Sequence, residues 1–526
     1  MRIALSGTWS LVRLILRRDR ISLLIWIAVA GLVPVSVAAV FRTLYQTPEA
    51  LSMAAVASNG TRAAVGLLGF VYAPSVGALV AWRTGLNSAF LIAPVAILLV
   101  IRHTRTEEET GRRELLGSAV GRQAPLAAAL IVVVGSTLAM AAIIAGGLVG
   151  QGLPASGAVA LGVSAALAGC MFGAVAAVVA QVTGSPGAAR GISLGLFALA
   201  WLARATGDLR GLPWLSWASP LGWIRLTRAF TGERWWVFGL VLGLLSALVA
   251  VAFALSARRD IGAALLPHRL GPSAAPPALR SPLALAWRLH RGALLGWAAG
   301  AAVLGLLLGA LGQSLSRFVE QPRMQEWAAR SGARDAGDAF LFLIMYVLGQ
   351  VVSAYAIAAV LRARAEEVEG RADIVLAGPV GRLRWAAGHL FFAVVGSALL
   401  LAVLGVTIGV GYGTSAGDLG RELPRLLART MLALPACWVM AGLTAALYGV
   451  LPRLVAGVAW GAFGVFLAIE LGWELGQVSR RVFAISPFAH VYWASPVSAT
   501  ALLVLATIAG ALVIVGQWGL RSRDFG

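Results

Sequence analysis

Apolar stretches alternate with short polar segments along the whole chain, and most of these stretches hold about 20 residues or more. An α-helix of that length spans the roughly 30 Å apolar core of a lipid bilayer. The pattern therefore predicts an all-α polytopic membrane protein with twelve transmembrane helices. The predicted spans cover residues 21–41, 82–101, 124–150, 158–182, 191–206, 237–257, 292–312, 339–361, 385–413, 426–450, 454–473 and 497–520.

Composition agrees with this pattern and narrows the choice of partners. Of the 526 residues, 59% are hydrophobic and 12% are charged, and the formal net charge is +20. A strong positive charge can indicate a nucleic-acid partner. Here the arginines stand in short clusters between apolar stretches, as the positive-inside rule places them on the cytoplasmic side. We therefore expect a multi-pass protein of a bacterial plasma membrane, with both termini in the cytoplasm and no nucleic-acid partner.

The basic residues are all arginine, and the absence of lysine bears on whether the chain hydrolyses ATP. A phosphate-binding loop of the GxxxxGK[ST] type needs its lysine to reach the β- and γ-phosphates. We therefore expect no nucleotide-binding motif and no catalytic residue in this chain. The two cysteines, Cys170 and Cys437, lie far apart in apolar stretches without His or Cys at ligand spacing. We expect neither a metal nor a cofactor.

A charged stretch recurs in the two halves of the sequence. RTEEETGR (105–112) follows the second predicted span, RAEEVEGR (364–371) follows the eighth, and VGR precedes the next span in both cases. The endings RRDIG (258–262) and RDFG (523–526) are also related. This duplication predicts two six-span halves, 1–262 and 287–526, joined by a proline-rich cytoplasmic linker, 263–286.

Segments of mixed character flank the predicted spans. Residues 1–20 interleave Arg with apolar side chains, which predicts an amphipathic helix in the cytoplasmic interface. Residues 208–236 and 474–496 combine Trp and Pro, and we predict outer interfacial or re-entrant helices there. Residues 42–81 are interpreted as an outer loop with a partly inserted piece, and a seventh span in this half is the alternative.

The repeated motifs resemble the permease subunits of type-2 ATP-binding-cassette (ABC) exporters, in the twelve-span branch called exporters of polyketide antibiotics. The resemblance covers essentially the whole chain. It rests on RTEEETGR…VGR, RAEEVEGR…GPVGR, ASPLGW (218–223), ISPF (485–488) and the two half endings. It implies separate cytoplasmic ABC ATPase subunits, two copies per permease chain, that bind ATP and Mg²⁺. The implied activity is multidrug export, and hence antibiotic resistance, with amphipathic or hydrophobic small molecules as cargo.

The resemblance also implies which segments couple to the ATPase. In such permeases an elbow helix precedes the first span, and the loop between the second and third spans carries the main coupling helix. By position, 105–122 and 364–384 are the main coupling segments, and 183–190 and 451–453 the minor ones. Gly111 and Gly121 are ten positions apart, whereas Gly370 and Gly381 are eleven apart, which predicts unequal docking surfaces. The candidate coupling residues are Arg105, Glu107, Glu108, Gly111, Arg112, Arg364, Glu366, Glu367, Gly370 and Arg371.

A second transporter class shares the two-half architecture. Secondary transporters of the major facilitator type also join two six-span halves, and the sequence TGRR (110–113) is superficially like the motif in their second loop. Ion-coupled carriers usually need ionisable residues near mid-membrane. The centres of the predicted spans hold almost none. We therefore favour ATP-driven export and keep an ion-coupled carrier as the alternative.

Cargo contacts are predicted from polar and aromatic side chains on the second and fifth spans of each half, although such side chains more often pack or face lipid. The candidates are Asn87, Phe90, Phe197, Trp201, Tyr346, Gln350, Tyr355, Phe463 and Phe466. Arg429 and Glu470 lie at similar depth on consecutive spans and form a candidate buried ion pair. Snorkelling of each side chain to the interface is the alternative.

Overall fold

A computed structural model describes residues 3–60, 62–109, 111, 120–259, 274, 279, 281–316, 336–474 and 477–523. Throughout these residues the regular structure is helical and no strand occurs. Within them, 12 helices are long and apolar enough to cross a membrane. The prediction of an all-α polytopic membrane protein is therefore confirmed.

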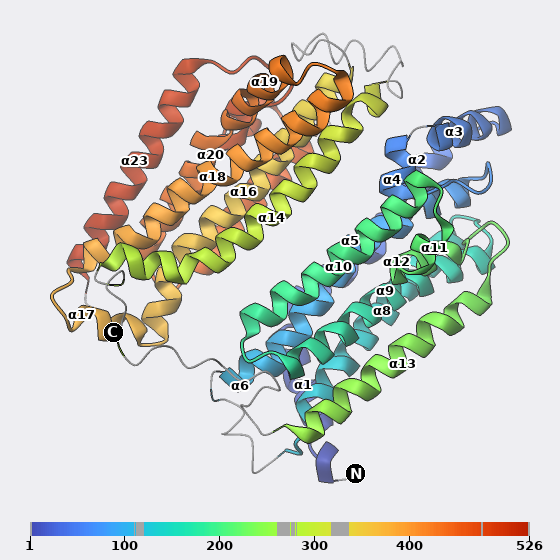
Figure 1. The fold of residues 1–526 in the computed structure, drawn as a ribbon, viewed down its shortest axis with the longest axis horizontal. Helices are drawn as coiled ribbons and strands as arrows, with labels where there is room; N and C mark the ends of the chain where they lie inside the picture. The colour runs from blue at the N-terminus through green and yellow to red at the C-terminus, as the bar shows by residue number, and fades with distance from the viewer. Residues whose placement is uncertain are drawn as a thin grey trace. The chain divides into compact units, whose positions relative to one another are not determined.

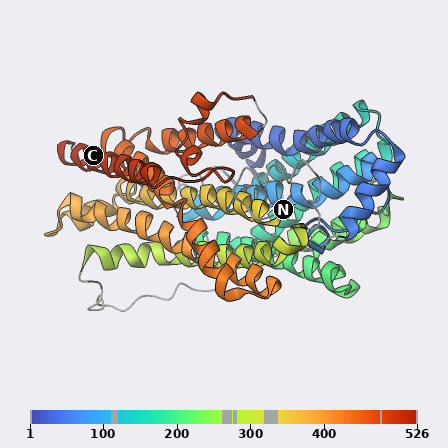
Figure 2. The same ribbon diagram turned by 90° about the horizontal axis from the view of Figure 1, so that it is seen from above.

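The chain divides into two compact units, Met1–Gly271 and Pro272–Gly526. Within each unit the long helices lie side by side along a common direction (Figures 1 and 2). Each unit contributes six of the candidate membrane spans.

In the first unit, the helix α9 is the most buried of the candidate spans and packs against α5, α8 and α13. Small residues allow this close packing, as is usual between membrane helices. The helices of this unit are α1 (Thr8–Arg18), α2 (Arg20–Leu44), α3 (Pro48–Gly60), α4 (Arg62–Leu68), α5 (Val76–Ile101), the π-helical segment η2 (Arg102–Thr106), α6 (Glu107–Glu109), α8 (Ala124–Gly150), α9 (Ala155–Val182), α10 (Pro186–Arg210), α11 (Pro213–Trp217), α12 (Pro220–Leu226) and α13 (Trp235–Arg258).

In the second unit, α18 packs along α14 and α16, and α20 packs along α23. A Cβ on Gly449 of α20 would meet the backbone of Gly516 on α23, so this crossing requires glycine. The helices are α14 (Pro282–Ser316), α16 (Ala336–Val368), α17 (Arg371–Leu376), α18 (Arg382–Ala416), α19 (Leu419–Met431), α20 (Leu434–Val450), α21 (Val455–Glu474), α22 (Arg480–Phe483), η5 (Pro487–Val491) and α23 (Ala499–Ser522).

Several predicted boundaries differ from the structure. Between α2 and α5, the 13-residue α3 is the longest helix, about 20 Å at 1.5 Å per residue, so a seventh span here is wrong. Helix α14 begins at Pro282, inside the predicted linker, and its basic stretch is continuous with the span. The span predicted from 426 is divided instead into α19 and α20, which are separated at Leu432 and Ala433.

Candidate functional site

The twin charged stretches lie at the ends of the second span of each unit. In the first unit, α5 runs through η2 into α6, and this places Glu108 inside the protein with 2% of its side chain exposed. Arg105 Nη1 donates to Glu108 Oε2 at 2.8 Å. From the end of α13, Arg259 donates through Nη2 to Oε1 at 2.7 Å and through Nη1 to Oε2 at 2.9 Å. One carboxylate thus lies between two guanidinium groups, and we call this set the first Arg–Glu–Arg cluster.

The first cluster also reaches the loop between the fourth and fifth spans. Arg105 donates through Nη2 and Nε to the carbonyl of Gly184, at 3.0 and 3.2 Å. Arg259 Nε donates to Gln181 Oε1 at 2.7 Å. Burial lowers the pKa of Arg259, but a guanidinium still stays protonated in a protein. The cluster therefore joins the ends of α5, α9 and α13 by hydrogen bonds between charged groups, which are stronger than neutral ones.

The second unit holds the corresponding second Arg–Glu–Arg cluster, centred on Glu367 of α16. Arg364 Nη1 lies 3.3 Å from Glu367 Oε1, and Arg523, after α23, donates through Nη2 to Oε2 at 2.8 Å. The Tyr448 hydroxyl of α20 donates to the same Oε2 at 2.7 Å, and the Arg523 guanidinium stacks over the Tyr448 ring at 4.8 Å. The second cluster is more exposed to solvent than the first, because 25% of the Arg364 side chain and 15% of the Arg523 side chain are exposed.

The first glutamate of each stretch pairs with a different arginine outside the clusters. Glu107 pairs with Arg18 of α1 at 2.6 Å, which links the N-terminal amphipathic helix to the second span. Glu366 pairs with Arg362 at 3.3 Å and with Arg371 Nε at 3.0 Å. Within the two stretches, the side chains of Arg105, Glu108, Glu366 and Glu367 are largely buried, while Glu109 and Glu369 face outward.

The glycine of each stretch has a left-handed backbone conformation. Gly111 and Gly370 both have φ of 69°, the left-handed region where glycine is favoured. Arg112 lies outside the described residues. After Gly370 the chain forms α17, whose Ala372 is buried beside Trp385. The same short helix leaves Ile374 79% exposed. A well-anchored short helix thus presents an apolar side chain outward.

Three of the predicted cargo residues in the first unit come together. Phe90 of α5 meets Phe197 and Trp201 of α10 edge-on, with ring centroids 5.2 and 5.7 Å apart. Phe197 and Trp201 are buried, while Phe90 is exposed on one side. Asn87 is exposed and donates to the carbonyl of Arg83 in its own helix. The two spans therefore share an aromatic contact with one open face.

The candidates in the second unit divide into two groups. Tyr346, with Gln350 one turn further along α16, lies toward α21 and donates its hydroxyl to Glu470. Phe463 of α21 packs in the same apolar core, with Phe466 at its edge. Tyr355 belongs elsewhere, because its hydroxyl donates to the carbonyl of Phe392 at 3.1 Å in the packing of α14, α16 and α18.

The structure does not bring Arg429 and Glu470 together. Arg429 donates to the carbonyl of Trp493 at 2.8 Å and lies 4.5 Å from the centre of the Phe342 ring. Glu470 accepts from Tyr346 instead. Each charged group thus has its own neutral partner.

Sequence reasoning missed the second arginine of each cluster. Arg259 and Arg523 stand in the repeated endings RRD and RD, which were noticed as a repeat without a contact being assigned to them. It also missed Asp19, whose carboxylate lies 2.6 Å from His103 Nε2 and 3.1 Å from Arg102. Among the described residues, no group of three or more His, Cys, Asp or Glu side chains could hold a metal ion.

Comparisons with known proteins identify the family of the chain. A family model described as "Multidrug efflux system permease Rv1217c, C-terminal domain" matches residues 279–521. The chain is also 39% identical over 526 residues to the multidrug efflux system permease protein Rv1217c of Mycobacterium tuberculosis (strain ATCC 25618 / H37Rv), covering 99% of this chain and 95% of that protein. The chain therefore belongs to the family of the multidrug efflux permease Rv1217c.

Proposed function

We propose that this chain is the membrane-spanning permease subunit of an ATP-driven ABC exporter, in the twelve-span type-2 branch. Two cytoplasmic ABC ATPase subunits bind ATP and Mg²⁺ and supply the energy, and both chain termini lie on their side of the membrane. The cargo is an amphipathic or hydrophobic small molecule of the antibiotic or polyketide kind. The main support for the proposal is the exposed side chain of Ile374 on α17. This short helix packs beside the second Arg–Glu–Arg cluster.

A coupling element has to transmit force, so it must be attached rigidly to the spans that move. The two clusters meet this requirement, because each joins the end of a second span to the ends of the fourth and sixth spans of its unit. Buried charged hydrogen bonds of this kind resist being pulled apart. In the proposed cycle, ATP binding closes the two ATPases. The clusters then transmit the resulting displacement to the helices of each unit.

The clusters divide the coupling residues into two roles. Arg105, Glu108 and Glu367 act as positioning residues inside the protein, since their contacts are with other parts of the same chain. The docking groups are the outward side chains next to them, namely Glu109, Glu369, Asp373 and Ile374. A partner with an apolar groove and basic rim fits this set, because a side chain contributes most to binding where it is fully desolvated in a pocket at the centre of an interface.

Co-purification from membranes tests the class. The tagged chain is extracted in mild detergent, and we expect a soluble ATPase to be retained in a 2:1 ratio. Ile374→Glu should abolish retention and ATP-dependent dye efflux while the chain still inserts. Ile485→Glu is the matched control, because Ile485 is also an exposed aliphatic side chain and lies at the opposite end of the same unit. Dye transport by the purified chain alone, driven by a proton gradient, would overturn the proposal in favour of an ion-coupled carrier.

A further inference from the structure

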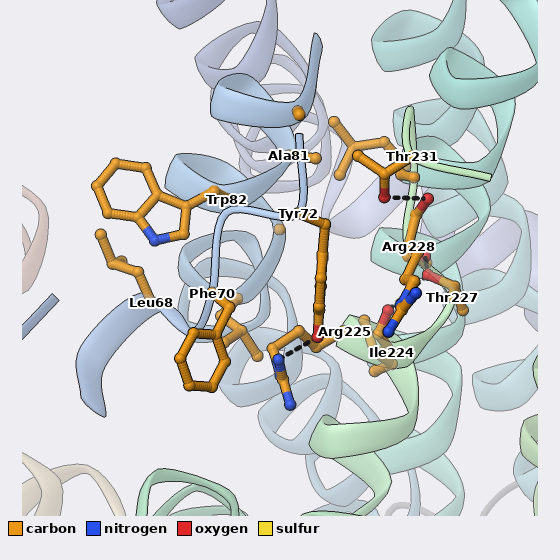
Figure 3. Close-up of a pocket in the computed structure, with 16 residues that line it drawn as sticks. Leu68, Phe70, Tyr72, Ala81, Trp82, Ile224, Arg225, Thr227, Arg228 and Thr231 are labelled. Atoms are coloured by element: carbon orange, nitrogen blue, oxygen red, sulfur yellow. Dashed lines mark hydrogen bonds between the residues drawn. The ribbon is translucent and has the colours of Figure 1, made fainter. Parts of the chain in front are cut away.

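A small pocket lies in the first unit, at the end of α5 opposite to the first Arg–Glu–Arg cluster (Figure 3). Its walls come from the loop before α5, from α5 and α9, and from α12 with the loop after it. Figure 3 shows Arg225 and Arg228 on two sides of Tyr72, with Phe70 and Trp82 nearby. The pocket thus combines cationic and aromatic groups.

Positive charge exceeds negative charge around this pocket. Arg204 and Arg225 share one carboxylate, Asp208, at 3.4 and 2.7 Å. Arg228 has no ion pair among the described residues and stacks 4.5 Å above the centre of the Tyr72 ring. Arg204 and Arg225 therefore share one carboxylate, and the half-buried Arg228 adds a positive charge that a bound anion would neutralise. Glu233, the carboxylate of the same loop, accepts from the Phe230 amide.

Hydrogen bonding is incomplete at the same place. The Nε atoms of Arg204, Arg225 and Arg228 are all buried without an acceptor. Arg225, which lines the pocket, is only 10% exposed and already donates to Asp208 and to the Tyr72 hydroxyl. Buried donors are nearly always satisfied in proteins. A bound anion would supply negative charge and acceptors for Arg225 and Arg228, the two of these arginines that line the pocket.

The backbone is strained to hold Arg228 there. Arg228 and Phe230 have φ of 54° and 64°, which is uncommon for residues other than glycine. The Phe230 ring fits against Gly77 of α5 and Gly157 of α9, where a Cβ would collide with it. This wedge fixes the loop in its strained form. Strain maintained by the surrounding packing is typical of sites that bind a ligand.

We propose that this pocket binds the anionic headgroup of an amphiphile, a carboxylate or phosphate whose apolar part extends past Phe70 and Trp82. The cavity volume is about 40 Å³, enough for roughly three water molecules. The pocket can therefore hold a headgroup but not a whole drug molecule. Arg228 is the principal ligand group and Arg225 the second. The amphiphile is either an anionic lipid or an exported anionic molecule. The site does not depend on the energy source proposed above.

Binding of 2-naphthoate tests the site, with neutral 2-naphthamide as its uncharged twin. Equilibrium dialysis uses the full chain in nanodiscs of zwitterionic phosphatidylcholine, and empty discs give the background. We expect the wild type to bind naphthoate about tenfold more tightly than naphthamide, because only the carboxylate carries a charge opposite to that of the guanidinium groups and can accept from them in a bidentate way. Equal binding of the two probes would overturn the proposal.

Arg228→Gly separates ligand binding from folding. Glycine accepts a φ of 54° without strain, so this variant should keep or raise the thermal midpoint while losing the tenfold preference. Arg210→Gln, an exposed arginine at the end of α10, is the control that should keep it. A preference that survives in R228G would refute the assignment.

Discs that contain phosphatidylglycerol distinguish the two sources of the anion. If a lipid headgroup occupies the pocket, naphthoate binding by the wild type weakens severalfold in these discs, beyond the change seen in empty ones. If the site serves a free anionic molecule, the affinity stays the same. Either result keeps the anion site, provided that R228G shows no preference in both kinds of disc.

Discussion

The two Arg–Glu–Arg clusters have the same plan and different surroundings. In the first, Arg105, Glu108 and Arg259 each have 5% or less of the side chain exposed. In the second, Arg364 and Arg523 reach water, and the Tyr448 hydroxyl donates to Glu367, whereas in the first cluster Gln181 accepts a hydrogen bond from Arg259. The duplicated motif therefore specifies which charges meet, while the packing around it decides how much each contact stabilises the unit.

The helices around the clusters differ in the same way. Ahead of the first cluster, α1 and α2 are separated at Asp19, which is held by His103 and Arg102. Ahead of the second, α14 is one continuous helix, and His290 contacts His389 at 3.0 Å. A separate helix needs its own attachment, and the acidic residue at the break provides it. This difference predicts that the first unit is more sensitive to loss of its charges.

The largest difference is expected on neutralising the central glutamates. Glu108→Gln leaves two buried guanidinium groups without that carboxylate, which costs about 3–5 kcal/mol of unfolding free energy. Glu367→Gln should cost about 1–2 kcal/mol, because Arg364 and Arg523 can be solvated. Unfolding of the purified variants by SDS, followed by circular dichroism, measures both. Equal losses would show that burial does not distinguish the clusters.

The next contrast concerns the arginines at the ends of the units. Arg259 makes a bidentate contact with Glu108 and a third hydrogen bond to Gln181. Lysine cannot reproduce this fork, so Arg259→Lys should cost about 2 kcal/mol. Arg523 makes one contact with Glu367 and lies on an aromatic ring, and Arg523→Lys should cost less than about 1 kcal/mol. The same SDS titration measures the pair, and a reversed order would contradict the assigned geometry.

These contacts mark how far the sequence could be interpreted. Hydropathy located the 12 spans, because a membrane helix must be apolar over its length. The repeat located both stretches, and the glycines in them, Gly111 and Gly370, share a φ of 69°. The partners of Glu108 and Glu367 could not be found in this way, since Arg259 is 151 residues away in sequence and Arg523 is 156. In each unit the sixth span packs on the fourth and the fourth packs on the second, and only this arrangement brings the charged groups together.

The predicted ion pair of Arg429 and Glu470 shows a second limit of prediction from the sequence. Similar depth on consecutive spans favoured a pair, but depth does not determine which way a side chain turns around its helix. Arg429 turns toward Phe342 and the Trp493 carbonyl, and Glu470 toward Tyr346. The aromatic contact of Phe90 with Phe197 and Trp201, in contrast, follows from side chains one turn apart on α10 that face the same neighbour.

A smaller effect should follow from Asp19→Asn, which weakens the attachment of α1. In a background without Cys170 and Cys437, a cysteine at the buried position Leu11 reports opening of α1 by its rate of maleimide labelling. Loss of the charged contacts to His103 and Arg102 should raise this rate about tenfold, equivalent to roughly 1.4 kcal/mol. A cysteine at the buried Ala286 of the continuous α14 is the control and should not respond to D19N.

Tyr448→Phe should have the smallest effect and separates the two components of the second cluster. The substitution removes the 2.7 Å hydrogen bond to Glu367 and keeps the ring under the Arg523 guanidinium. Because Glu367 retains Arg364 and Arg523, the expected loss is about 1 kcal/mol, the usual net value of one hydrogen bond. Tyr448→Leu also removes the ring and should cost about 1 kcal/mol more. If the two variants unfold at the same SDS concentration, the stacked ring contributes nothing, and the second cluster depends on its ion pairs and on the Tyr448 hydrogen bond.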